Sequence, residues 1–188
     1  MNMILTFMLL LASASGWTQQ VNMNRIYLEQ MVIIGNSNIS GIKLSFRSDH
    51  LSKNQLVSGV IEDGMVVFYI PVDNITAKNR LMLNDFRDLI HADNFPYIKL
   101  AISNEQMINL TNKHFSECIN VDVTLAGLSK TYHIPFYKNC SNDNSSYITG
   151  NADLYLSDFN IYPDKKIFGL LKLDNKVFIN FKINFAET

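Results

Sequence analysis

The sequence predicts an all-β fold, either a closed antiparallel barrel or a sandwich, covered by one short helix. Three observations favour it: apolar and polar residues alternate in several segments, these segments are rich in β-branched and aromatic residues, and one stretch has helical periodicity instead. The chain has 188 residues, 47% of them hydrophobic, which is enough for a sizeable core in a single domain.

Alternation with a period of two identifies the strands, because successive side chains of a strand point to opposite faces. In the first such segment Ile42, Leu44 and Phe46 share one face, and Lys43 and Ser45 lie on the other. The same pattern occurs in segments 42–46, 98–102, 119–125 and 177–185. Segments 27–34 and 65–72 are more uniformly apolar, and their composition also favours strands.

The helical stretch covers residues 79–91. Its apolar residues Met82, Phe86, Leu89 and Ile90 are spaced three to four apart, which places them on one helical face. We expect this face, and Phe86, Leu89 and Ile90 in particular, to cap apolar surface at one end of the strands.

Segment 121–136 is typical of a hairpin, with residues 127–130 as a plausible connection. If Ala126 faces Thr131, then Cys118 faces Asn139, next to Cys140, and a bulge would bring the two sulfurs together. These are the only two cysteines, and they lack the spacing of a metal site. In an oxidising compartment a disulfide between them and two free thiols are both open.

The N-terminal segment resembles a secretory signal peptide. An apolar run at residues 4–11 is followed by small residues at 12–16, so we expect a signal peptide over residues 1–18 and a single mature domain over residues 19–188. A transmembrane anchor is the alternative, but a span needs about 20 apolar residues. We therefore expect export to the periplasm or the extracellular space, with no integral membrane span after cleavage.

Charge and motifs narrow the classes of function. Lys and Arg number 16 against 17 Asp and Glu, so the net charge of -1 gives no reason to expect nucleic acid as a partner. No nucleophile, metal-ligand or phosphate-loop motif is present, and the histidines are far apart in the sequence: His50, His91, His114 and His133. We expect no enzymatic activity, no catalytic residue, no metal and no cofactor. The sequence makes no prediction about oligomeric state.

Three segments between residues 84 and 159 carry a family resemblance. Residues 84–98 combine a helix with the pattern Asp93-x-Phe95-Pro96-x-Ile98, residues 121–131 form a strand followed by Gly127, and residues 150–159 end in Ser-Asp-Phe. In this order they resemble the YceI-like family of polyisoprenoid-binding proteins. One departure is Asn160, which stands where many members have glycine after Ser-Asp-Phe.

The resemblance implies an extended lipocalin-like antiparallel β-barrel of about eight strands, with an apolar interior that holds a polyisoprenoid, a quinone or a similar long lipid. An eight-stranded barrel is wide enough for one slender ligand. Alternatively, the same residues form only a core, and the protein is a stress-associated or partner-binding barrel filled by its own side chains. The residues expected to face inward and line the barrel are Ile42, Leu44, Phe46, Phe68, Ile98, Leu100, Ile102, Val121, Val123, Ile179 and Phe181.

Overall fold

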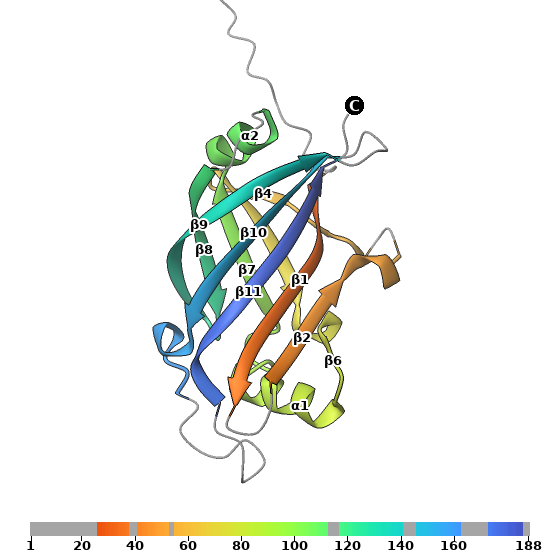
Figure 1. Ribbon diagram of the computed structural model, residues 1–188, viewed down its shortest axis with the longest axis vertical. Coiled ribbons are helices and arrows are strands. Elements are labelled where there is room, and N and C mark those ends of the chain that lie inside the picture. Colours follow the sequence, from red (N-terminus) through yellow and green to blue (C-terminus); the bar gives the residue numbers. More distant parts are fainter. Residues whose placement is uncertain are drawn as a thin grey trace, which may run out of the picture.

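The computed structural model describes residues 26–37, 41–52, 55–112, 117–140, 146–162 and 173–185 (Figure 1). The expected signal peptide and His114 lie outside these residues. The strands are β1 Ile26–Ser37, β2 Gly41–Arg47, β3 Val57–Ser58, β4 Val60–Glu62, β5 Met65–Pro71, β6 Thr76–Ala77, β7 Tyr97–Ser103, β8 Glu117–Leu125, β9 Leu128–Cys140, β10 Ser146–Tyr155 and β11 Leu173–Phe185. The α-helices are α1 Arg80–Leu89 and α2 Asn104–Asn112, and the 3-10 helices are η2 Ser48–His50, η4 Val72–Asn74 and η5 Leu156–Phe159.

The described strands form one strongly curled antiparallel sheet in the order β4-β5-β7-β8-β9-β10-β11-β1-β2-β6, with β3 attached to β1. Of the two alternatives from the sequence, a sandwich of two sheets is therefore wrong. Eight of the strands have seven residues or more, and the other three are short. The expected number of about eight thus corresponds to the long strands alone.

A short segment, residues 57–62, bridges two strands that stand near opposite ends of the strand order. In this segment β3 pairs with β1, and β4 pairs with β5. Gly59 lies between β3 and β4 and donates a backbone hydrogen bond of 2.9 Å to the carbonyl oxygen of Ile26. Residues 57–62 therefore hydrogen-bond to both β1 and β5, which are far apart in the strand order.

The two α-helices lie at opposite ends of the sheet, α2 at the upper end and α1 at the lower end in Figure 1. The predicted helix is confirmed as α1. Its N-cap is Asn79, whose side chain accepts a hydrogen bond of 2.9 Å from the backbone N–H of Leu81. The expectation of a single helix was wrong, because α2 follows β7 directly. Ser103 Oγ accepts a hydrogen bond from the backbone N–H of Gln106 at its start, and Met107 and Leu110 are buried.

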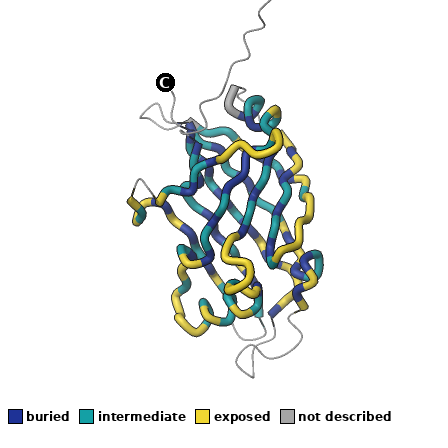
Figure 2. Tube along the Cα trace, turned by 180° about the vertical axis from the view of Figure 1, so that it is seen from behind, coloured by how far each residue is buried: buried dark blue, intermediate teal, exposed yellow. Residues whose placement is uncertain are grey.

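The interior contains the apolar face of each long strand, and buried residues alternate with more exposed ones along the tube in Figure 2. The upper half is closely packed around large rings. Phe136 and Phe181 lie with their ring centroids 5.3 Å apart, and Phe46 and Phe68 are as deeply buried. We call these four side chains the ring cluster.

The β8–β9 hairpin has a different register from the one expected. Leu125 pairs with Leu128, so the turn consists of Ala126 and Gly127, both with positive φ, and not of residues 127–130. Cys118 consequently faces Pro135, whereas Cys140 pairs with Ser146 of β10. The structure has Cys118 as a free, exposed cysteine, and the side chain of Cys140 lies outside the described part of the chain. The register on which the possible disulfide depended is therefore wrong.

Candidate functional site

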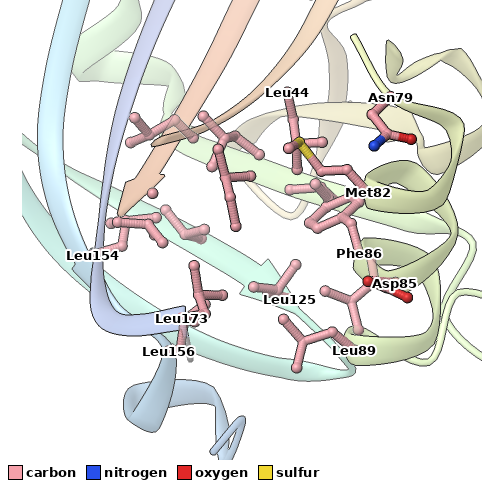
Figure 3. A pocket seen from close by; sticks show the side chains of 18 of the residues that line it. Leu44, Asn79, Met82, Asp85, Phe86, Leu89, Leu125, Leu154, Leu156 and Leu173 are labelled. Carbon is pink, nitrogen blue, oxygen red and sulfur yellow. The ribbon is translucent and has the colours of Figure 1, made fainter. Parts of the chain in front are cut away.

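A cavity of about 450 Å³ occupies the lower half of the molecule, between the sheet and α1 (Figure 3). Strands from both sides of the sheet contribute to it, together with η5 and one face of the helix. The lining residues are Ile33, Gly35, Ile42, Leu44, Asn79, Leu81, Met82, Asp85, Phe86, Leu89, Ile90, Ile98, Val123, Leu125, Leu154, Leu156, Leu173, Val177 and Ile179. The volume lies within the range usual for small-molecule sites, about 300–1,000 Å³.

Helix α1 closes the lower end of this cavity. Its residues Met82, Phe86 and Leu89 project towards the strands in Figure 3, as their helical spacing predicts. The guanidinium of Arg87 pairs with the carboxylate of Asp73 in η4, which ties the helix to the segment that follows β5. The apolar face of the helix therefore covers the cavity, and Arg87 on the opposite face forms an ion pair with η4.

The cavity reaches the molecular surface beside the first turn of α1. Leu81 lines the cavity although 57% of its surface is exposed to solvent, whereas Ile90 at the other end of the helix is 1% exposed. A residue can combine both properties only at an opening. We call the opening beside Leu81 the mouth.

Among the described residues that line the cavity, only two have polar side chains, and both belong to the helical segment. Asn79 uses its side-chain oxygen to cap the helix. Asp85 has a carboxyl oxygen, Oδ2, that is inaccessible to solvent and has no hydrogen-bond partner among the described residues. Burial raises the pKa of Asp85 above its usual value, and the negative charge of Asp88 raises it further. An apolar wall with one partly buried carboxyl favours a ligand that is mainly hydrocarbon.

The inward-facing residues expected from the sequence divide into two groups. Ile42, Leu44, Ile98, Val123 and Ile179 line the cavity, together with the helix residues Phe86, Leu89 and Ile90. The others are buried but do not line it: Phe46, Phe68, Leu100, Ile102, Val121 and Phe181. The second group makes up the packed upper half.

Several lining residues were missed in the sequence. Leu125, Leu154 and Val177 stand near the lower ends of their strands and continue the same alternation. Leu125 and Val177 lie within the alternating segments 119–125 and 177–185, but they were left out of the expected lining. Leu156 is the first residue of the 3-10 helix η5, and Leu173 is the first residue of β11. The alternation of a strand does not extend beyond such a position, so it does not mark these residues.

The three segments that carry the family resemblance contact one another near the cavity. The ring of Phe95 packs directly on Gly127, where a Cβ atom would clash with it. Tyr132, which directly follows the second segment, donates a hydrogen bond of 2.7 Å to Asp158 Oδ2, and its ring lies 6.2 Å from that of Phe159. Burial and this bond raise the pKa of the Tyr132 hydroxyl, so it remains protonated as a donor.

The Ser-Asp-Phe segment forms η5 and connects three strands. The backbone N–H of Ser157 donates to Asn175 Oδ1 at 2.8 Å, and Asn175 Nδ2 donates to Ser157 Oγ at 2.9 Å. Asn160 follows with φ of 55°, in the left-handed region that glycine and asparagine tolerate best. Asparagine at this position, where many members of the family have glycine, is therefore compatible with the same backbone.

The described part of the chain contains no group of three or more metal-binding side chains. Of the histidines described, His50, His91 and His133 are all exposed, and His133 Nδ1 lies 3.1 Å from Asn120 Oδ1. No helix within the described ranges is long and apolar enough to cross a membrane.

Comparison with known proteins identifies the fold. No family model matches the sequence, and no curated protein matches it. A polyisoprenoid-binding domain from Saccharophagus degradans, implicated in plant cell wall breakdown, is similar with a TM-score of 0.67 at 9% identity, over 87% of this chain and 99% of that one. BcnA of Burkholderia cenocepacia has a TM-score of 0.52 at 10% identity, over 89% of this chain and 100% of that one.

A YceI protein of Campylobacter jejuni is similar with a TM-score of 0.50 at 12% identity, over 98% of this chain and 99% of that one. At such low identity the likeness concerns the fold. The contacts among the three sequence segments and these structural similarities lead to one conclusion: the chain has the fold of YceI proteins and of a polyisoprenoid-binding domain.

Proposed function

We propose that this chain is an exported, non-catalytic lipid-binding protein that holds the chain of an isoprenoid, a quinone or a similar lipid inside an extended lipocalin-like barrel. The observation that carries the proposal is the cavity under α1, in which all lining side chains except Asn79 and Asp85 are apolar. The structural similarity to a polyisoprenoid-binding domain supports the same ligand class.

The energetics favour a hydrocarbon chain. Each buried CH₂ group contributes about 0.8 kcal/mol, so a chain that fills the cavity gains enough to offset the loss of its own freedom on binding. The Oδ2 atom of Asp85, which has no hydrogen-bond partner within the described ranges, adds one hydrogen-bonding group. We expect the polar end of the ligand to lie on the α1 side, where both polar side chains are located.

The alternative function is that of a partner-binding or stress-associated barrel filled by its own side chains. The ring cluster supports this alternative for the upper half, where buried side chains fill the interior. It does not account for the lower half, because a barrel with a purely structural core gains nothing from an apolar cavity of about 450 Å³.

Native purification followed by mass spectrometry of an organic extract tests the proposal. We expect a lipid with a long hydrocarbon part, present in near-stoichiometric amount. Leu44→Trp should place an indole in the cavity and reduce that amount at least about tenfold, since the ring occupies the space of the ligand. The matched control is Leu128→Trp, because Leu128 is 40% exposed and does not line the cavity.

The carrier proposal fails if protein purified without detergent carries no lipid and long-chain isoprenoids and quinones leave its melting temperature unchanged. Export is tested separately by the intact mass of the secreted protein. We expect the mature chain to begin between residues 15 and 20, and a mass that includes Met1 contradicts this part of the proposal.

A further inference from the structure

We infer that the cavity is a blind pocket that encloses about three isoprene units and that the ring cluster stops a longer chain from entering further. This inference rests on the proposed function and specifies its ligand. The proposed function names the class of lipid, and this inference adds the length of its hydrocarbon chain that the protein encloses.

Neighbouring inward positions on the same strand differ in whether they line the cavity. Side chains two residues apart lie on one face, so Leu44 and Phe46 are successive positions along the interior, as are Ile179 and Phe181. The lower member of each pair lines the cavity and the upper member does not. The same division occurs on β7 between Ile98 and Leu100, and on β8 between Val123 and Val121.

The layer of side chains above the cavity is tightly filled. Phe46, Leu100, Val121 and Phe181 are each at most 1% exposed. A Cβ atom on Gly150 would lie 2.7 Å from Phe181 Cε2 and 3.1 Å from Phe136 Cε1, so the two rings press against the backbone of β10. A hydrocarbon chain can pass this layer only by displacing rings that already have a close-packed arrangement.

The volume of the cavity limits the length of chain that it can enclose. A CH₂ group occupies about as much space as a water molecule in the liquid, about 30 Å³. The cavity of about 450 Å³ therefore accommodates about 15 carbon atoms. That number corresponds to three isoprene units, and the remainder of a longer chain has to leave through the mouth beside Leu81.

The test is a chain-length series of free prenols, measured by displacement of a fluorescent apolar probe from the intact protein. The series consists of geraniol, farnesol, geranylgeraniol and solanesol, with two, three, four and nine isoprene units. We expect affinity to rise at least about tenfold from geraniol to farnesol and then to change by less than about threefold, because further units stay in solvent. A steady increase through geranylgeraniol and solanesol overturns the inference and leaves the proposed function intact. Absence of binding by every prenol counts against the proposed function itself.

Two variants test the role of the rings. Phe181→Ala removes a ring about the size of one isoprene unit, so the plateau should move from farnesol to geranylgeraniol. The control is Phe185→Ala, the same truncation four residues further up β11, which should leave the plateau at farnesol. If Phe181→Ala does not fold, Ile179→Phe extends a ring into the cavity instead and should move the plateau to geraniol. A plateau that stays at farnesol in a folded Phe181→Ala or Ile179→Phe protein overturns the assignment of the stop to this layer.

Discussion

Gly150 is the residue on which the arrangement of Phe136 and Phe181 depends. Both rings approach its backbone more closely than a Cβ atom would allow. Gly150→Ala should therefore destabilise the protein by about 1–3 kcal/mol, since the rings and the strand have to move apart. Urea denaturation measures the change.

The matched control for this substitution is Gly41→Ala. A Cβ atom at Gly41 would meet nothing within 4 Å, so we expect a change within about 0.5 kcal/mol. Equal losses for the two variants would show that general strand effects, and not the ring contacts, set the cost.

Asp85 predicts a dependence of stability on pH. Its pKa is raised in the folded protein from 3.8, chiefly by burial and then by the charge of Asp88. The protonated form is favoured in the folded state, so its contribution is fully present below pH 3.8 and is lost as pH rises through the folded pKa. Asp85→Asn should therefore raise the melting temperature by a few degrees at pH 7 and change it little at pH 3.

The control for this pH dependence is Asp93→Asn, which removes an exposed carboxyl beyond the same helix. It should change the melting temperature little at either pH. An Asp85→Asn protein that is less stable than the wild type at pH 7 contradicts the prediction, because the carboxylate would then have a favourable partner.

The alternation in the sequence predicts which single residues face inward, but it does not predict which of them line a cavity. Leu44 and Phe46 have the same alternation and nearly the same burial, 3% and 1% exposed. They differ in what lies opposite them across the interior, which depends on the sheet as a whole. The cysteine register failed for a local reason: Ala126 has a φ of 49°, and alanine is an unusual residue for the first position of such a turn.

Helix α1 and the ring cluster should differ in their contribution to stability. Phe86 is only partly buried and faces the cavity, so Phe86→Ala should cost about 1–2 kcal/mol. Phe181 is 1% exposed in close packing, and Phe181→Ala should cost about 3–5 kcal/mol. Denaturant unfolding of the two variants without added lipid makes the comparison, and a larger loss at Phe86 would contradict the assignment of the cavity to the helix side.

Among the elements, α1 could be predicted because its apolar residues recur over three turns with a clear polar face. Helix α2 was missed because only Met107 and Leu110 of its described side chains are fully buried. Ser103 followed three residues later by Gln106 is a capping pattern, and together with the Met107–Leu110 spacing it would have indicated a helix.

The whole molecule combines a filled upper half with a lower half that contains the cavity. Saturation with farnesol should therefore stabilise it unevenly. At a free concentration about 100 times the dissociation constant, the free energy of unfolding should rise by about 2.7 kcal/mol. Amide hydrogen exchange should slow mainly in α1 and in the lower parts of β10 and β11, and little around the ring cluster.

A uniform decrease in exchange over the whole sheet would contradict this picture, because it would indicate binding outside the cavity. A lipid-free Leu44→Trp protein is a useful reference for the same measurement. Its exchange near α1 should not respond to farnesol, whereas that of Leu128→Trp should respond like the wild type.

The family resemblance and the period of two predicted the long strands, the antiparallel arrangement and the helix at one end. The short strands β3, β4 and β6 could not be predicted, because segments of two or three residues carry no periodicity. Their pairing depends on where β1, β2 and β5 lie in the finished sheet.

These short strands also have a consequence for the edges of the sheet. The described sheet ends in β4, with three residues, and β6, with two, and each of them pairs with only part of the longer strand beside it. On β2, residues that β6 does not cover include Lys43 and Arg47, and both are exposed. Charged side chains at a strand edge oppose the stacking of chains into aggregates. The part of β2 that β6 leaves uncovered therefore carries charge at an edge where another chain could otherwise add a strand.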